Sequence, residues 1–481
     1  MGILLGYLNW VLLFPHFLDK EEMGLVRIFL DTGILLSTIF GAAVNQTLIK
    51  HYPYKEEGFN RNYLFRYGLI ALSSLLLLSI FFFSLEGELK SFFSKKAALF
   101  DQYFHLVYGI ILFQMMFDFF ESLNKIRLNI SSATLIKEVL LKAMLLLFVA
   151  GYGLGGYPLH ILLWGIIIAF AIQWLLMCIL FFRKWNPDNS ALRFQKPSKE
   201  EATYLFYMFL GSGSSVLVTQ IDTIMTGGMK SLQHAAVYAM AVFMSNVVYM
   251  PFRTFTSIST PLLSNYYAQN LRSKIADLYK NSSNTLFFLG AFIFLAIWFN
   301  VDFIFSLIPE KNDGSIRFSD GKWVLFLIGM SRLLDMISGV NAIILVHSKH
   351  YRLHFYTMPI LAILTIGGNL LLIPRFDLMG AAIATLISIT LFNLLRFLLL
   401  WWKEKLQPFT WETLYIVLLF SLCLLPSFMP IPIEGIVRIF LSGIWILCVF
   451  ILPNYVFGLT PELRNFIDKR IRNDAGKGGD K

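Results

Sequence analysis

The chain has 481 residues, of which 57% are hydrophobic and 15% are charged, and its mean hydropathy is +0.65. These values lie outside the range of soluble globular domains, so the composition predicts an integral membrane protein. The formal net charge of +10 does not indicate nucleic-acid binding, because basic residues also fix membrane topology and face anionic lipid headgroups.

Fourteen blocks of the sequence are predicted to span the membrane as helices, since a span needs roughly 20 mostly apolar residues. The first block lacks a basic leader and a small-residue cleavage pattern, so we interpret it as a retained helix and not as a signal peptide. The predicted spans are residues 2–18, 24–48, 64–85, 103–120, 138–154, 159–182, 203–226, 233–258, 284–308, 323–346, 353–374, 378–402, 412–430 and 435–457.

Lys and Arg are distributed unequally over the connections between these spans. The tail and the connections on the side of the termini contain 24 of them, whereas the opposite connections contain 9. Basic loops are retained in the cytoplasm, so we expect both termini to be cytoplasmic.

The spacing of the spans suggests two comparable halves followed by an extension. We predict an N-terminal six-helix bundle at 1–182, a cytoplasmic linker at 183–202 and a C-terminal six-helix bundle at 203–402. Two additional membrane helices at 403–457 and a cytoplasmic tail at 458–481 follow. Two halves that rock about a site near the bilayer midplane are a common transporter design.

Basic residues deep within the spans are candidates for function, because a charge at membrane depth is costly and usually faces a bundle interior or a water-filled cavity. We predict five of them to be substrate-binding cations: Arg332, Arg253, Arg396, Lys142 and Arg27. An Arg holds a phosphate group through paired N–H donors and keeps its charge when partly desolvated.

Three acids lie at comparable depth. Asp31 follows Arg27 by four residues and Asp335 follows Arg332 by three, so each pair shares a helix face and can form an intrahelical ion pair. A purely structural role stays open for both pairs, because such pairing lowers the cost of insertion. Asp335, Asp31 and Asp222 are also candidates for coupling transport to H⁺ or Na⁺.

Amides inside the spans add polar groups that can bond across helix interfaces. Pro251 is predicted to kink its span just before Arg253. Two further arginines, Arg66 and Arg438, lie near span ends, so we expect them to reach the headgroups. The predicted polar cavity residues are Asn246, Asn341, Asn369 and Gln114.

Catalysis is the weaker hypothesis. The longest outward connections, 86–102 and 309–322, offer no convincing acid–base pair, and the sequence has no phosphate-binding Gly loop. Three His residues flank an inner connection at 347–354, a pattern more typical of an interface than of metal ligands. We therefore predict no catalytic residue, no metal site and no cofactor, apart from a counter-transported Na⁺ or H⁺.

Four stretches of the sequence carry a family resemblance: "EEMGLVRIFLDTG" at 21–33, "AVYAMAVFMSNVVYMPFRTFTSISTPLLSNYYAQN" at 236–270, "LIGMSRLLDMISGVNAIIL" at 327–345 and "LMGAAIATLIS" at 378–388. They resemble the polysaccharide biosynthesis proteins of the oligosaccharide flippase group, of the Bacteroidetes kind, within the multidrug/oligosaccharidyl-lipid/polysaccharide (MOP) exporter superfamily. The resemblance implies an all-α polytopic fold, with two six-helix bundles in a V shape and two C-terminal helices.

The resemblance further implies a flippase of the bacterial inner membrane that moves a polyprenyl-pyrophosphate-linked oligosaccharide by alternating access. Its partners would be this lipid-linked substrate, membrane lipids and other polysaccharide-assembly proteins, with no nucleic acid. Three alternatives stay open: a cation-coupled multidrug exporter of the same superfamily, a flippase for a peptidoglycan lipid precursor, and a membrane-bound glycan-processing enzyme.

Overall fold

The computed structural model describes residues 2–52, 61–94, 97–126, 130–183, 196–310, 316–429, 435–461 and 464. Over these residues the chain forms helices joined by short turns, and no strand. The chain divides into two compact units, of which the first is Met1–Met240, Ile308–Phe318 and Met358–Ala381 and the second is Ala241–Leu307, Ser319–Thr357 and Ala382–Lys481.

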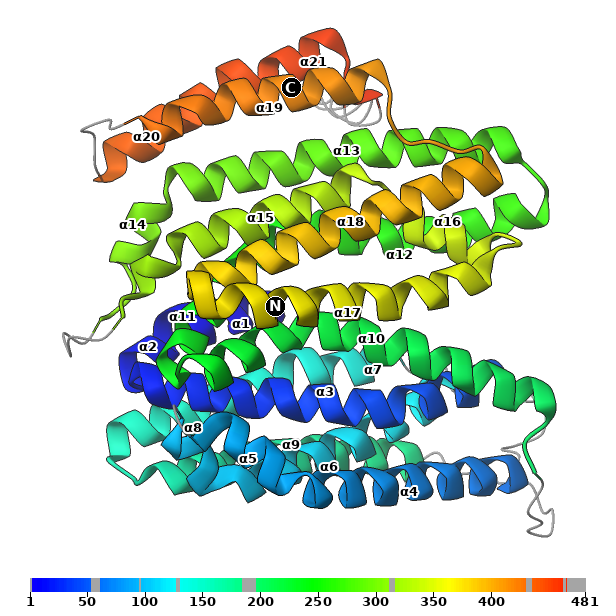
Figure 1. Cartoon of the computed structure of the whole chain (residues 1–481), viewed down its shortest axis with the longest axis vertical. Coiled ribbons are helices and arrows are strands. Elements are labelled where there is room, and N and C mark those ends of the chain that lie inside the picture. Colours follow the sequence, from blue (N-terminus) through cyan, green and yellow to red (C-terminus); the bar gives the residue numbers. More distant parts are fainter. Residues whose placement is uncertain are drawn as a thin grey trace, which may run out of the picture. The chain divides into compact units, whose positions relative to one another are not determined.

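The first unit is built around one long helix, α3, which packs against α6 and α10, while α6 packs against α9 (Figure 1). The helices wholly in this unit are α1 (Gly2–Tyr7), η1 (Leu8–Leu13), α2 (Phe14–Phe17), α3 (Lys20–Lys50), α4 (Arg61–Ser84), α5 (Glu86–Ser94), α6 (Ala98–Ile126), α7 (Ile130–Leu135), η2 (Ile136–Leu140), α8 (Leu141–Gly155), α9 (Leu159–Arg183) and α10 (Lys199–Met229).

The second unit is built around α13, which packs against α15 and carries α19 and α20 on another side (Figure 1). Its helices are α12 (Met250–Ala268), α13 (Arg272–Phe299), α14 (Val301–Ser306), α15 (Lys322–Ile337), α16 (Asn341–His347), α19 (Trp411–Leu424), η4 (Leu425–Phe428), α20 (Gly435–Ile446), η5 (Leu447–Ile451) and α21 (Leu452–Phe457). Four helices contribute residues to both units: α11 (Leu232–Val248), η3 (Phe318–Gly321), α17 (Tyr351–Phe376) and α18 (Leu378–Glu404).

Local sequence signals explain where several helices begin and approach one another. Both α3 and α10 start with a capping box, in which the side chains of Asp19 and Ser198 accept from the backbone N–H three residues later, while their own backbone N–H groups donate to the glutamate side chain at that position. Gly24 of α3 lies directly against the backbone of Leu232 in α11, so any side chain there would overlap that carbonyl group. Small residues of this kind permit close helix packing in membranes.

Ten helices of the described chain are long and apolar enough to cross a membrane, or twelve when each of two bent pairs counts as one span. The predicted count of fourteen is therefore not confirmed. The predicted spans that fall outside this set are 2–18 and 138–154, and both contain a π-helical segment, η1 or η2.

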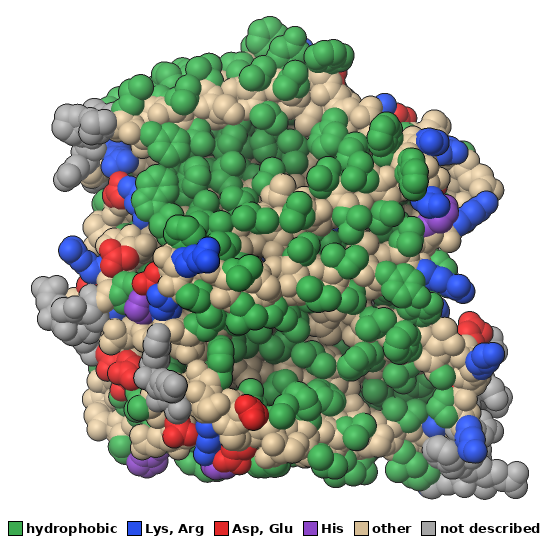
Figure 2. All heavy atoms as spheres, viewed as in Figure 1, with side chains coloured by type: hydrophobic (Ala, Val, Ile, Leu, Met, Phe, Trp, Pro, Cys, Tyr) green, Lys and Arg blue, Asp and Glu red, His purple; other side chains and the backbone are tan. Residues whose placement is uncertain are grey.

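Hydrophobic side chains cover most of the visible face, while charged side chains gather mainly toward the ends of the helices (Figure 2). Leu77 and Ile80 of α4, for example, are 61% and 65% exposed. Exposed apolar helix faces with polar ends are expected where lipid replaces water as the solvent.

The predicted bundle boundaries at residues 182 and 203 stay predictions. The linker 183–202 lies outside the described residues except for 183 and 196–202, and the tail 458–481 lies outside them except for 458–461 and 464.

Candidate functional site

Asp335 is the centre of a polar network in the second unit. It lies on α15 and accepts a hydrogen bond from the Tyr249 hydroxyl, at the junction of α11 and α12, and one of 2.9 Å from Nδ2 of Asn393 in α18. Helix α15 ends only two residues later, and Gly339, with a φ of +59°, turns the chain into α16 at a bend of 45°.

The orientation of Asn393 is fixed by a second amide. Its Oδ1 accepts a hydrogen bond of 3.0 Å from Nδ2 of Asn341, the first residue of α16, so its Nδ2 faces Asp335. Asn393 is 4% and Asn341 is 2% exposed. The predicted polar residue Asn341 therefore acts on Asp335 only indirectly, by fixing the orientation of Asn393.

Arg332 lies one turn before Asp335 on α15, but no ion pair joins the two residues among those the structure describes. Its Nη2 instead donates to Oδ1 of Asn246 at 3.2 Å, and its guanidinium lies 5.2 Å from the centre of the Tyr249 ring. Its Nε is buried and has no hydrogen-bond partner within the described ranges. The suggested intrahelical pair with Asp335 is thus not formed, because Asp335 turns toward Tyr249 and Asn393.

Arg396 lies on α18, three residues after Asn393, and is 4% exposed. Its Nη2 donates to Nδ1 of His354 at 3.2 Å, and its guanidinium stacks 4.0 Å from the centre of the Phe392 ring. Because an arginine can only donate, this bond requires that Nδ1 of His354 carries no proton. His354 is therefore held as a neutral acceptor.

Arg253 is exposed on α12 and makes no side-chain hydrogen bond or ion pair with the part of the chain that the structure describes. The predicted kink before it is confirmed. Helices α11 and α12 meet at an angle of 50°, and Pro251 occupies the first turn of α12.

The predicted cations of the first unit are matched by carboxylates of their own helix or its continuation. Nε of Arg27 lies 2.8 Å from Oδ2 of Asp31, which confirms the predicted pair, and its guanidinium lies 5.0 Å from the Trp10 ring. Nζ of Lys142 lies 2.7 Å from Oε2 of Glu138, one turn earlier. Both cations thus have an intrahelical counter-charge.

Asp222 forms a second buried carboxylate cluster, in the first unit. It is 6% exposed and accepts hydrogen bonds from the Tyr238 hydroxyl at 3.0 Å and from Nδ2 of Asn369 at 2.7 Å. Asn369 is fully buried, and its Oδ1 has no hydrogen-bond partner in the described part of the chain. The residue that donates to Asp222 thus also carries an acceptor oxygen for which these residues supply no donor.

Gln114 lies apart from both clusters. Its Nε2 donates to Oδ1 of Asp118, one turn later on α6, at 2.8 Å, and Nζ of Lys137 lies 3.9 Å from the same oxygen. Across the described residues, no group of three or more His, Cys, Asp or Glu is arranged to hold a metal ion.

Comparison with known proteins decides the family. Residues 2–267, more than half of the chain, match the family of polysaccharide biosynthesis proteins. The chain belongs to this family. No curated protein sequence matches it.

Two solved structures show which fold this polysaccharide biosynthesis protein has. One is a lipid II flippase MurJ in an inward closed conformation, with a TM-score of 0.71 and 13% identity over 95% of this chain and 96% of that chain. The other is an inward-facing multidrug resistance MATE transporter of the MOP superfamily, with a TM-score of 0.62 and 15% identity over 82% and 92%. The predicted fold class, an all-α polytopic protein of the MATE/MOP kind, is confirmed.

Two features of this family member were not expected from its sequence. His354 accepts a hydrogen bond from Arg396. Arg66 is buried and forms an ion pair of 2.7 Å with Glu201, which also belongs to the capping box of α10. Only the Ser-x-x-Glu spacing at Ser198 could have signalled one part of this arrangement.

Proposed function

We propose that the chain is a flippase that moves a polyprenyl-pyrophosphate-linked oligosaccharide from the inner to the outer leaflet of the bacterial inner membrane. Its two termini lie in the cytoplasm, and it works by alternating access. Membership of the polysaccharide biosynthesis family and the transporter fold support this proposal. The observation that carries it is the state of Arg332, a partly exposed cation without a carboxylate partner among the residues that the structure describes.

Arg332 is positioned by neutral groups and retains hydrogen-bonding capacity. Asn246 accepts only one of its five N–H groups, and the ring of Tyr249 holds the plane of the guanidinium. A pyrophosphate offers several charged oxygen acceptors, of which a planar guanidinium can bind two at once through paired N–H groups. The charge is thus held in place and available for an anionic substrate.

The other predicted cations take secondary roles. Arg253, exposed and without a side-chain partner in the described chain, is a second contact for the pyrophosphate. Arg396 is almost fully buried, so we assign it to shaping the network beside Asp335. Arg27 and Lys142 already have carboxylate partners and are weaker candidates for substrate contact.

The same proposal includes an ion that drives the cycle, with Asp222 as the coupling acid. The Asp222 carboxylate and the unpaired Oδ1 of Asn369 are oxygen ligands of the kind that Na⁺ binds, and protonation of Asp222 is the alternative. A driving ion must bind the two conformations with different affinities. Asp335 and Asp31 remain further candidates for the coupling acid. Asp335 accepts a hydrogen bond from Tyr249, and Asp31 accepts one from Arg27.

The central test is surface glycan production in a strain that lacks the native gene. Arg332→Ala should lower it at least ten-fold, because hydrogen bonds to charged groups contribute about 1.5–3 kcal/mol. Arg332→Lys should rescue it only in part, because an ammonium keeps the charge but loses the planar fork. Arg375→Gln, which removes an exposed charge at the end of α17, is the matched control. Normal glycan in both Arg332 variants at normal protein levels would exclude the substrate contact.

The driving ion is tested with purified protein in proteoliposomes. Wild-type transport should respond to an imposed Na⁺ or H⁺ gradient, and Asp222→Asn should remove that response while leaving substrate binding intact. The same vesicles separate the alternative cargoes, because a multidrug exporter would move a cationic dye, and a flippase for a peptidoglycan precursor would move lipid II. Transport of either compound in place of the oligosaccharide lipid would overturn the proposed cargo and replace it with the compound that is transported.

A further inference from the structure

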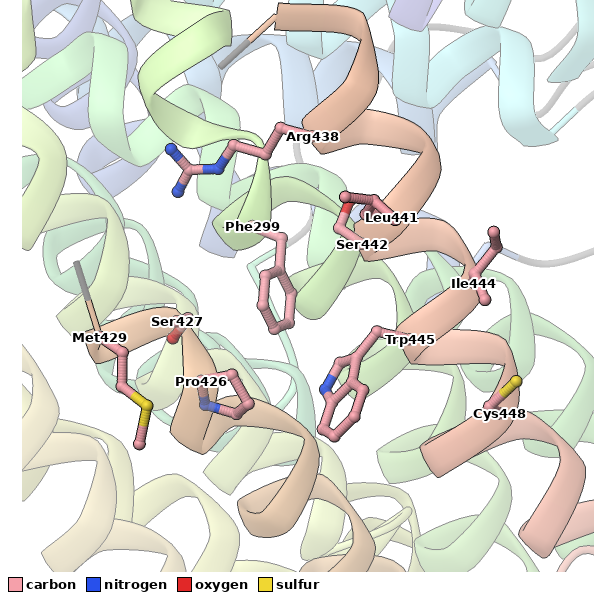
Figure 3. Close-up of a pocket in the computed structure, with 10 residues that line it drawn as sticks. All are labelled: Phe299, Pro426, Ser427, Met429, Arg438, Leu441, Ser442, Ile444, Trp445 and Cys448. Carbon is pink, nitrogen blue, oxygen red and sulfur yellow. The ribbon is translucent and has the colours of Figure 1, made fainter. Parts of the chain in front are cut away.

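A cavity of about 520 Å³ lies in the second unit, where α20 and the end of α19 pack beside α13 (Figure 3). Phe299 at the end of α13, Pro426 of η4, and Leu441 and Trp445 of α20 point toward it. The helices α19 and α20 lie beyond residues 2–267, the part matched by the family. None of the residues that line the cavity belongs to either carboxylate cluster, so the cavity is separate from both.

The polar atoms in the walls of this cavity are already used within the protein. Nε1 of Trp445 donates to the backbone oxygen of Cys423 at 3.0 Å, and the Ser427 hydroxyl accepts from Nε1 of Trp298 at 2.9 Å. The Ser442 hydroxyl contacts Oδ1 of Asn300 at 3.5 Å. What remains on the inner surface is mostly hydrocarbon, so an occupant must be apolar over most of its length.

One end of the cavity is positively charged. Nη1 of Arg438 lies 3.3 Å from Oδ2 of Asp302, and Nζ of Lys322 lies 2.6 Å from the other oxygen of that carboxylate. Two cations thus face one anion, and the Arg438 side chain is 29% exposed. Most of its five N–H groups stay available to an anion, and Asp302 holds it at the rim.

The length of the cavity matches one leaflet of a bilayer. From Arg438 in α20 at the charged end to Cys448 in η5 at the far end, the helix advances ten residues, which is about 15 Å at the 1.5 Å per residue of an α-helix. The hydrocarbon core of a bilayer is about 30 Å thick, so one leaflet is about half of that. The site thus suits a single acyl chain that ends in a headgroup at the surface.

We propose that this cavity binds one anionic glycerophospholipid, with its phosphate at Arg438 and Lys322 and one acyl chain along α20 as far as Cys448. The lipid joins α20 to α13 and η4 as a resident part of the fold. It is not the transported substrate, since neither Arg332 nor Asp222 lines the site.

The first experiment measures lipid retention by native mass spectrometry of the full-length protein in detergent. Phosphatidylglycerol should be retained more strongly than phosphatidylcholine with the same acyl chains. Arg438→Gln should weaken phosphatidylglycerol binding about five-fold, the effect expected for one basic residue at an anionic lipid surface. Arg375→Gln removes an exposed charge outside the cavity and should leave binding unchanged.

Two results of this experiment would overturn the proposal. Equal retention of both phospholipids, with no effect of Arg438→Gln, would reduce the cavity to an ordinary lipid-facing surface. Displacement of phosphatidylglycerol by an equimolar amount of undecaprenyl phosphate would assign the site to a polyprenyl chain instead.

Cys448 gives a second, independent readout at the far end of the cavity. It is exposed, whereas Cys178 and Cys423 are buried, so a maleimide should modify Cys448 first. Added phosphatidylglycerol should slow this reaction several-fold in the wild type and much less in Arg438→Gln, and Cys448→Ser supplies the blank. A reaction rate that does not change with phosphatidylglycerol would show that no acyl chain reaches this depth.

Discussion

The intramembrane cations of the first unit and those of the second are held by different kinds of partner. Arg27 and Arg66 in the first unit form ion pairs of 2.8 and 2.7 Å with carboxylates. Arg332 in the second unit is held by an amide and an aromatic ring, and Arg396 lies against a neutral histidine and a phenylalanine ring. The first arrangement neutralises charge for insertion, whereas in our proposal the second leaves the partly exposed charge of Arg332 available to an anion.

The two carboxylates, Asp222 and Asp335, have the same kinds of neutral donor, so the difference between the units lies in their cations. Asp222 accepts from the hydroxyl of Tyr238 and the amide of Asn369, and Asp335 accepts from the corresponding groups of Tyr249 and Asn393. The network around Asp335 also has a cation on its tyrosine, since the Arg332 guanidinium lies 5.2 Å from the centre of the Tyr249 ring. In our proposal it is this arginine, and not the shared Asp–Tyr–Asn arrangement, that distinguishes the anion site from the site for a coupling cation.

The largest effect is expected from Arg66→Ala, which should lower the free energy of unfolding by about 3–5 kcal/mol. Both Arg66 and Glu201 are 7% exposed, and the substitution leaves Glu201 as an uncompensated buried charge. The measurement is unfolding of the purified protein in detergent. The double variant Arg66→Ala/Glu201→Ala is the control and should recover part of the loss. A single-variant loss below about 1 kcal/mol would mean that water reaches this pair.

A smaller effect is expected from Arg27→Gln, about 3 kcal/mol at the lower end of the same range, because the Arg27 side chain is 17% exposed. Asp31 would remain buried without its counter-charge. The neutral double variant Arg27→Gln/Asp31→Asn should return to within about 1 kcal/mol of the wild type and retain transport. If the double variant is stable but inactive, Arg27 and Asp31 take part in transport and the two units differ less than we infer.

Substitution of one tyrosine in each cluster tests whether water is excluded equally from Asp222 and from Asp335. Tyr238→Phe removes a hydrogen bond to Asp222, which is 6% exposed, and should cost about 1.5–3 kcal/mol, the contribution of a bond to a charged group. Tyr249→Phe should cost less, since Asp335 is only half-buried and water can replace the hydroxyl. Parallel unfolding measurements in detergent check this order. Equal losses would place Asp335 in an environment as closed as that of Asp222.

Local features of this structure could be predicted from the sequence, because they depend on helical periodicity alone. The membrane spans, the kink before Arg253 and the pair Arg27–Asp31 are all set by residues within a few turns of one another. Spacing brings two residues to one face but does not decide where their side chains turn. Arg332 and Asp335 share a face and yet bind different partners.

The contacts that define the candidate sites join distant positions. Asn393 and Asp335 are 58 residues apart, Arg332 and Asn246 are 86 apart, and Arg66 and Glu201 are 135 apart. Which helices become neighbours depends on packing of the whole unit, and a single sequence contains no local signal for this packing. Asn393 and His354 were accordingly missed as site residues, although both are polar residues inside or beside predicted spans.

The smallest effect is expected at the amide pair Asn341–Asn393, which orients the side-chain donor to Asp335. A double-mutant cycle of Asn341→Ala and Asn393→Ala should give a coupling energy of about 0.6 kcal/mol, the average for hydrogen bonds between membrane helices. Asn393→Ala alone should also lower transport, because it releases Asp335, whereas Asn341→Ala acts only through the orientation of Asn393. Transport should therefore fall more in Asn393→Ala than in Asn341→Ala, although the two variants should lose similar stability. Equal transport in Asn393→Ala and Asn341→Ala would indicate that Tyr249, and not Asn393, positions Asp335. The Asp335 and Asp222 clusters would then share their geometry but not the role of the asparagine.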